Sequence, residues 1–170
     1  MLFCAVCRSA PPNVKVLPIA SLELYDCGFL GGCDLLVLSN GIAFARVVER
    51  PRGESAMREQ RFKIRLKSSE LAQLRAVLSE HHFSRITIKD RPGIPDETRT
   101  VIRVRFSDGQ RKEISKWAAD NHADFDPIYQ HLLGIVNRAS KTQPVYSGAV
   151  DDEWKPEEFQ QWREPTRRSE

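Results

Sequence analysis

Four cysteines are the residues of this sequence best suited to chemistry, and they form two pairs, Cys4 with Cys7 and Cys27 with Cys33. Four thiolates are a ligand set for structural zinc, but only the first pair has the two-residue spacing of a zinc knuckle. A disulfide between Cys27 and Cys33 is a second interpretation, because the three glycines between them let the loop turn back. Such a bridge would stabilise the fold by about 2 kcal/mol in an oxidising compartment. In a reducing compartment we expect four free thiols.

His122 is the one histidine set among carboxylates, in the stretch "WAADNHADFD" of residues 117–126. A histidine beside a carboxylate is suited to general acid/base work or to metal binding. Capping of the helix that follows explains the nearby aspartates equally well. No nucleophile, base and orienting group can be named together, so the sequence predicts no catalytic residue, metal or cofactor.

Basic side chains alternate with apolar ones in two stretches, residues 61–67 and 99–106. This alternation has the strand period of two, so the basic residues share one face of a sheet. These candidate polyanion-binding residues are Arg61, Lys63, Arg65, Lys67, Arg103 and Arg105. Nucleic-acid sites interleave aromatic residues with basic ones, whereas the phenylalanines here fall on the opposite face. The pattern allows polyanion binding but favours a solvated sheet face, in which Glu23, Glu49 and Glu113 on neighbouring strands offset the like charges.

The charges are unevenly distributed along the chain. Residues 40–117 contain eighteen Lys or Arg and ten Asp or Glu, whereas residues 145–170 contain four basic and seven acidic side chains. This asymmetry indicates an anionic partner for the domain, a contact between tail and domain, or simply a contribution to solubility. A third interpretation of the basic face is therefore that the acidic tail, with Asp151, Asp152 and Glu153 beside Trp154, folds back over part of it.

Aromatic residues provide candidate anchors for a protein partner, because tryptophan is enriched at the centres of protein interfaces. These candidates are Trp117, Trp154, Phe159 and Trp162. A role in packing against the domain itself is equally compatible with their types.

Strand signals dominate the first two thirds of the chain. We expect a strand at residues 18–26, a hairpin at 34–50, strands at 61–67 and 84–90, and a second hairpin at 99–117. Asn40-Gly41 and Asp108-Gly109 mark the hairpin turns, and such pairs predict type I′ turns. Two prolines and a glycine predict a loop at residues 91–98.

Helical periodicity is found in two longer stretches. Residues 68–82 carry an apolar stripe and begin with two serines, either of which suits the N-cap. Residues 124–139 predict a second helix, with Asp126 as its cap and Pro127 at the first helical position. Pro156 opens a short third helix that lays aromatic residues on the domain.

Hairpins interrupted by helices predict an α+β fold, in which two main helices pack on one face of an antiparallel sheet and a C-terminal tail follows. The chain of 170 residues is long enough for one such domain. We expect the domain at residues 18–140 and an acidic tail with tryptophans at residues 141–170. No stretch is apolar enough to predict a membrane span. Residues 1–17 are a short N-terminal segment in a cytoplasmic protein, or the remnant of a truncated signal in an exported one.

The run "CGFLGGCDLLVLSNGIAF" at residues 27–44, the leucines of the first helix, Phe83, and "TVIRVRFSDGQRKEISKW" at residues 100–117 carry a resemblance. Together they resemble a family of small uncharacterised bacterial α+β domains that place a cysteine-bracketed glycine loop before a hairpin. The resemblance covers about residues 18–139. It implies the fold, a Cys27–Cys33 disulfide as a structural staple and occurrence in exported proteins, and it implies no activity.

These observations favour a non-enzymatic binding module whose partner is a protein of unknown identity. The alternative is binding of nucleic acid or another polyanion through the basic sheet face, which would weaken steeply with salt. A third hypothesis is an enzyme that uses His122. The oligomeric state does not follow from the sequence.

Overall fold

The computed structural model describes residues 18–28 and 31–160 and confirms an α+β fold. The strands are β1 (Ile19–Gly28), β2 (Gly31–Leu38), β3 (Ile42–Glu49), β4 (Arg58–Arg65), β5 (Arg99–Phe106), β6 (Arg111–Trp117) and β7 (Tyr146–Ala149). The helices are α1 (Ser68–Glu80), the 3-10 turn η1 (Phe83–Arg85), α2 (Phe125–Ala139) and α3 (Glu157–Gln160). Among the described residues, no helix is long and apolar enough to cross a membrane.

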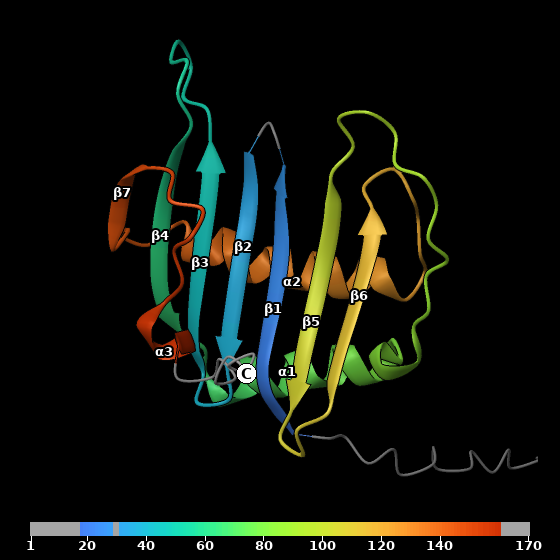
Figure 1. Cartoon of the computed structure of the whole chain (residues 1–170). Helices are drawn as coiled ribbons and strands as arrows, with labels where there is room; N and C mark the ends of the chain where they lie inside the picture. The colour runs from blue at the N-terminus through green and yellow to red at the C-terminus, as the bar shows by residue number, and fades with distance from the viewer. Residues whose placement is uncertain (1–17, 29–30, 161–170) are drawn as a thin grey trace, which may run out of the picture.

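The strands form one antiparallel sheet in the order β6-β5-β1-β2-β3-β4-β7. β1 lies near the centre and pairs with β2 on one side and with β5 on the other. Both main helices pack against the same face of this sheet, as Figure 1 shows. The opposite face is called the free face below.

The core lies between the sheet and the two helices. Inward-facing strand residues such as Leu22, Phe62 and Ile102 are fully buried, and so are Ile128 and Leu132 of α2. Alternation along β4 and β5 sends the basic side chains to the free face, as predicted. The predicted division of the two faces is therefore confirmed.

Both hairpin turns differ from the predicted type I′ geometry, which needs positive φ at two consecutive residues. Only the glycines have positive φ, 84° at Gly41 and 87° at Gly109. The Gly41 N–H donates to the Leu38 carbonyl at 2.9 Å, so the turn lies one residue earlier than expected. The side-chain oxygens of Asn40 and Asp108 each accept the N–H two residues further on, at 3.0 and 2.9 Å. The loops, residues 39–41 and 107–110, need one glycine each and use the preceding side chain as a local acceptor.

Both helices begin differently from the prediction. α1 includes the two serines in its first turn, and the Glu70 carboxylate accepts the Lys67 N–H at 2.7 Å. A carboxylate that reaches back in this way satisfies a backbone donor at the helix start without a serine cap. α2 begins at Phe125, so Asp126 and Pro127 lie inside its first turn.

Residues 84–90 do not form the predicted strand. Phe83 and Ile86 are buried in the core, and the chain between them makes the short turn η1. β5 already pairs with β1 and β6 on its two sides, so this stretch cannot pair with the strand that follows it in the sequence. The buried side chains of Phe83 and Ile86 attach this stretch to the core without backbone pairing.

β7 was not predicted from the sequence. Its four residues, YSGA, lack apolar alternation and are mostly exposed. The strand forms because its backbone pairs with β4, from Arg61 opposite Tyr146 to Arg58 opposite Ala149. Part of the expected tail is therefore a strand at the edge of the sheet.

Candidate functional site

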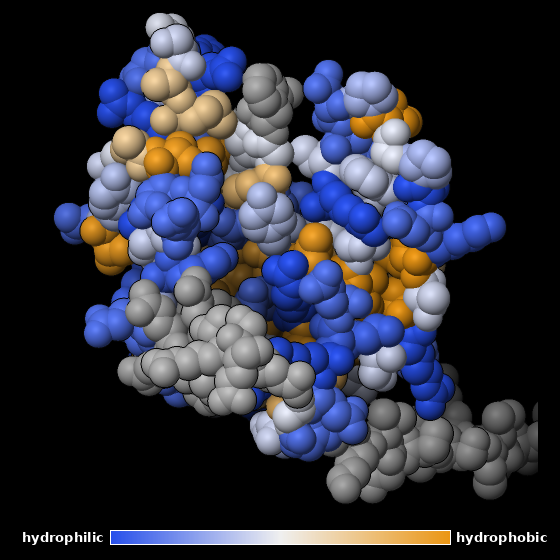
Figure 2. Space-filling view, in the orientation of Figure 1, coloured by the Kyte–Doolittle hydropathy of each residue, from blue (hydrophilic) through white to orange (hydrophobic). Residues whose placement is uncertain are grey.

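The free face has two rows of side chains that run across the strands, because directly paired residues point the same way. One row is Glu113, Arg103, Glu23, Leu36, Phe44 and Lys63. The next is Ser115, Val101, Tyr25, Asp34, Arg46, Arg61 and Tyr146. Figure 2 shows apolar surface at the centre of this face, with charged side chains around it.

Residues 146–158 are called the C-terminal segment below. The segment begins as β7 beside β4, and the residues after β7 cross the β3–β4 half of the free face (Figure 1). The charged side chains of this half form a network of ion pairs. Arg46 donates through Nε to Glu59 at 2.5 Å and through Nη1 to Asp34 at 3.1 Å. Arg61 also pairs with Glu59, whose side chain is fully buried. One buried carboxylate is therefore shared by two arginines.

The C-terminal segment completes this network. The Asp152 carboxylate lies 3.3 Å from Arg46 Nη2, and the Asp151 carboxylate lies 3.5 Å from Arg61. The backbone of Asp151 takes part as well, since its carbonyl accepts from Arg46 at 3.2 Å and its N–H donates to Glu59 at 3.3 Å. The hypothesis that the acidic tail folds back over the basic face is confirmed by these contacts.

Trp154 is the apolar anchor of the segment. It packs against a small cluster formed by Leu36, Leu38 and Phe44 on β2 and β3. The Arg61 guanidinium lies 4.4 Å from the centre of its ring. The same guanidinium lies 4.2 Å from the ring of Tyr146, so Arg61 contacts two aromatic rings of the segment.

A cleft of about 50 Å³ lies beside Trp154, between the segment and the centre of the sheet. Its lining includes Glu23, Tyr25, Asp34, Leu36, Phe44, Arg46, Arg103, Trp154, Lys155 and Pro156. Tyr25 is 43% exposed, although it is a large apolar residue. Burial raises the pKa of Glu23 in this cleft despite the nearby Arg103. The cleft therefore combines aromatic, cationic and acidic groups in a space that suits one side chain.

The predicted basic residues have different partners. Lys63 pairs with Glu158 of the C-terminal segment at 2.5 Å, and Arg65 donates to the Asn40 carbonyl at 3.3 Å. Arg103 pairs with Glu113 at 2.5 Å and lies 3.9 Å from Glu23. Lys67 lies beyond the end of β4, next to α1, and Arg105 lies on the free face of β5. The structure thus brings Arg61 and Lys63 together under the segment and places Arg103 at the cleft.

Trp117 packs against a loop on the β6 side of the sheet, away from Trp154. Its indole N–H donates to the Arg91 carbonyl at 3.1 Å, and Arg99 lies 5.2 Å from its ring. A side chain at Gly93 would come within 2.7 Å of the same ring. Phe159 falls in α3, but its side chain and the whole of Trp162 lie outside the described residues.

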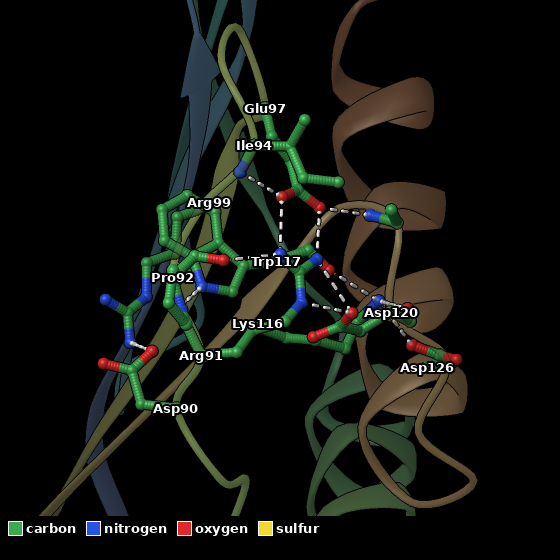
Figure 3. Close-up of polar contacts among 11 residues, drawn as sticks. Asp90, Arg91, Pro92, Ile94, Glu97, Arg99, Lys116, Trp117, Asp120 and Asp126 are labelled. Atoms are coloured by element: carbon green, nitrogen blue, oxygen red, sulfur yellow. Dashed lines mark hydrogen bonds and ion pairs between the residues drawn. The ribbon is translucent and has the colours of Figure 1, made fainter.

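The loop over Trp117 is held by one carboxylate, as Figure 3 shows. Glu97 accepts two hydrogen bonds from Arg91, at 2.7 and 3.0 Å, and one from the Ala119 N–H at 3.0 Å. Arg91 also donates to Asp120 at 2.9 Å. These contacts lower the pKa of Glu97 to about 2. We call this arrangement the loop clamp, because it ties residues 91–97 to the β6–α2 connection.

His122 caps α2. Its Nδ1 accepts the N–H groups of Asp124 and Phe125 at 3.3 and 3.2 Å, while Asp126 accepts the His122 N–H at 2.9 Å. This reciprocal arrangement satisfies three backbone donors at the helix start. It is the capping interpretation of the sequence, with the histidine itself as the acceptor.

Cys27 and Cys33 are free thiols on neighbouring strands. Cys33 pairs with Asp26 and faces the core, whereas Cys27 follows Asp26 and faces the opposite side of the sheet. A bridge between them would have to pass through the sheet, so the implied disulfide is not formed in this arrangement. Burial raises the pKa of Cys33 to about 12. Cys4 and Cys7 lie outside the described residues, in which no cluster of metal-ligating side chains is found.

Arg46, Glu59, Glu23 and Tyr25 are site residues that the sequence prediction left out. Glu59 is in phase with Arg61 two residues later, so extending the alternation of residues 61–67 backwards would have placed it on the free face. Arg46 is likewise in phase with Phe44 on β3. The pattern could indicate the face, but the burial of these charges depends on the C-terminal segment.

Comparison with protein-family models, with curated proteins and with solved structures finds no match.

Proposed function

We propose that the protein is a non-enzymatic binding module, and that the cleft beside Trp154 takes a side chain of a protein partner. The observation that carries the proposal is the exposed Tyr25 in a cleft with Trp154 and Arg103. Tyrosine, tryptophan and arginine are the residue types that contribute most to protein–protein affinity. The C-terminal segment holds Trp154 in place, which reduces the entropy lost on binding.

A protein partner is supported over a polyanion by the charges of the free face. Arg61 and Lys63 are paired with carboxylates of the C-terminal segment. Arg103 is paired with Glu113, and Glu23 lies in the same cleft. A polyanion would have to displace or lie beside these carboxylates, whereas a mixed surface of this kind suits a mixed protein surface.

The test is a selection of peptides from a display library against the full chain, followed by affinity measurements on variants. Tyr25→Ala and Arg103→Ala should each weaken the selected peptides at least about tenfold. Val145→Ala and Arg58→Ala are matched controls, because they remove an exposed apolar residue and an exposed arginine outside the cleft. These controls should leave affinity unchanged.

Two results would contradict the proposal. One is a set of selected peptides that bind the Tyr25→Ala and Arg103→Ala variants as tightly as they bind the wild-type chain. The other is tight binding of heparin or a single-stranded oligonucleotide with a steep loss of affinity in salt, which would support the polyanion alternative.

A further inference from the structure

We infer that the surface beneath the C-terminal segment recognises an extended acidic stretch of a partner protein in which a tryptophan follows two carboxylates, and that residues 146–158 occupy this surface in cis. The surface, called the receptor surface below, consists of Leu36, Leu38, Phe44, Arg46, Arg61, Lys63 and the edge of β4. This inference goes beyond the proposed function, because the cleft beside Trp154 takes a side chain while the segment is in place, whereas the partner stretch described here replaces the segment.

The backbone of β4 provides the first part of the recognition. β7 adds to β4 as an antiparallel edge strand over four residue pairs. Addition of a strand to a sheet edge is a general mode of peptide binding, in which main-chain hydrogen bonds supply affinity with little sequence dependence. The sequence of β7, with its exposed small residues, is in keeping with this weak dependence.

Charge complementarity provides the second part. The receptor surface presents three cations, Arg46, Arg61 and Lys63. The segment places one carboxylate beside each of them, Asp152, Asp151 and Glu158 respectively. Glu59 and Asp34 supply two carboxylates of the sheet to the two arginines, and the carboxylates of the segment add further acceptors for both arginines and a partner for Lys63.

Trp154 provides the third part and fixes the register. Its ring covers the apolar cluster at Leu36 and Phe44, and it stacks on Arg61. The contacts therefore define a short recognition pattern, two carboxylates and then an aromatic ring two residues later, as in Asp151-Asp152-Glu153-Trp154.

The cis segment does not satisfy every buried group of this surface. Among the described residues, Arg61 Nε of this surface and Asp34 Oδ1 beside Arg46 are buried side-chain atoms without a hydrogen-bond partner. Buried polar atoms of this kind each cost free energy, and a ligand with a better-placed acceptor or donor would recover it. A partner stretch can therefore compete with the tethered segment, although the tether gives the segment an effective concentration of the order of millimolar.

The experiment opens the segment in the full chain and supplies it again as a peptide. The opened variant carries Asp151→Asn, Asp152→Asn and Trp154→Ala, and the probe is a fluorescent peptide of residues 144–160. We expect the probe to bind the opened variant at least about tenfold more tightly than it binds the wild-type chain, whose own segment competes. A probe with the same three substitutions is the matched control and should bind neither protein.

The exposed ion pair tests the register of binding. Lys63→Glu in the opened variant should weaken the probe, and a probe with Glu158→Lys should restore its affinity to that variant. The contrary result is an opened variant that keeps its circular dichroism and cooperative unfolding but does not bind the probe. The cleft variants Tyr25→Ala and Arg103→Ala test the proposed function separately, because they are measured in the wild-type chain with its segment in place.

A second format covers an opened variant that unfolds. A protease site placed between Ser140 and Tyr146 allows the wild-type segment to be cut after folding. The cut segment should remain bound and exchange with labelled probe, and failure to exchange would overturn the inference. A wild-type chain that forms concentration-dependent dimers by exchanging segments would also overturn it, because the occupant would then be a second copy.

Discussion

The two halves of the free face contain the same kind of charged pair in different surroundings. On the β3–β4 half, Arg46 and Glu59 lie beneath the C-terminal segment and are almost fully buried. On the β5–β6 half, Arg103 and Glu113 are about half exposed to solvent. The donor–acceptor distance is 2.5 Å in both pairs, so geometry alone does not distinguish them.

The difference shows that burial decides how much each pair contributes to stability and whether it can exchange partners. An exposed pair contributes at most about 1 kcal/mol and can exchange partners, because water screens its charges. A buried pair cannot lose one member without leaving an uncompensated charge in a region of low dielectric. The β3–β4 half is therefore covered by the C-terminal segment in the free protein, and the β5–β6 half with the cleft is open to a partner without displacement of that segment.

The largest effect is expected for Glu59→Gln, which leaves Arg46 and Arg61 without their shared buried carboxylate. We expect a loss of about 3 to 5 kcal/mol in the free energy of unfolding. Denaturant titration measures this loss. Glu113→Gln is the matched control on the exposed half, and equal losses in the two variants would remove the distinction between the halves.

Trp154→Ala should have the next largest effect. The substitution removes the contacts with Leu36, Leu38 and Phe44 and the stacking on Arg61, and we expect a loss of about 2 kcal/mol. Thermal or denaturant unfolding measures it. Tyr25→Ala removes an exposed ring from the same face and should cost less than about 1 kcal/mol, so a larger loss there than at Trp154 would speak against the anchor role.

The loop clamp predicts a pH dependence on the β5–β6 side. The pKa of Glu97 is about 2 in the folded protein and 4.5 ordinarily, so the unfolded chain binds more protons between these values. The stability that Glu97 contributes is therefore complete above pH 4.5 and is lost as the pH falls towards 2. Unfolding measured across this range should show a smaller decrease for Glu97→Gln than for the wild type. Parallel curves for the two proteins would contradict the clamp.

The smallest effect is expected for Arg103→Ala. This residue pairs with Glu113 in solvent, and we expect a change in stability of less than about 1 kcal/mol that shrinks further in salt. Its effect should fall on ligand affinity instead. A stability loss of the size expected for Glu59→Gln would show that the β5–β6 half is as fixed as the other.

The sequence predicts the fold well where a segment's own pattern is sufficient. Alternation identified the hairpins and the division of faces, and the apolar stripes located α1 and α2. Strand formation by residues 146–149 depended on the edge of β4, and residues 84–90 are instead held by the buried side chains of Phe83 and Ile86. No local pattern records either outcome. The hairpin turns and helix caps were placed incorrectly because several polar side chains nearby can accept the same backbone N–H.

The site was predicted in outline. Charge asymmetry indicated that the tail could cover the basic face, and Asp151, Asp152 and Trp154 do so. Arg46 and Glu59 were missed because charged residues are expected at the surface, and their burial requires three separate parts of the chain to meet. The cleft arises from the same meeting, so it could not be read from any one segment.

The most direct test of the binding site is a two-dimensional amide NMR spectrum of the full chain, recorded while a display-selected peptide is added. The account predicts that the largest shifts fall at the cleft, on Tyr25, Leu36, Arg103 and the indole N–H of Trp154. Shifts confined to α1 and α2, or to the basic residues away from the cleft, would contradict it.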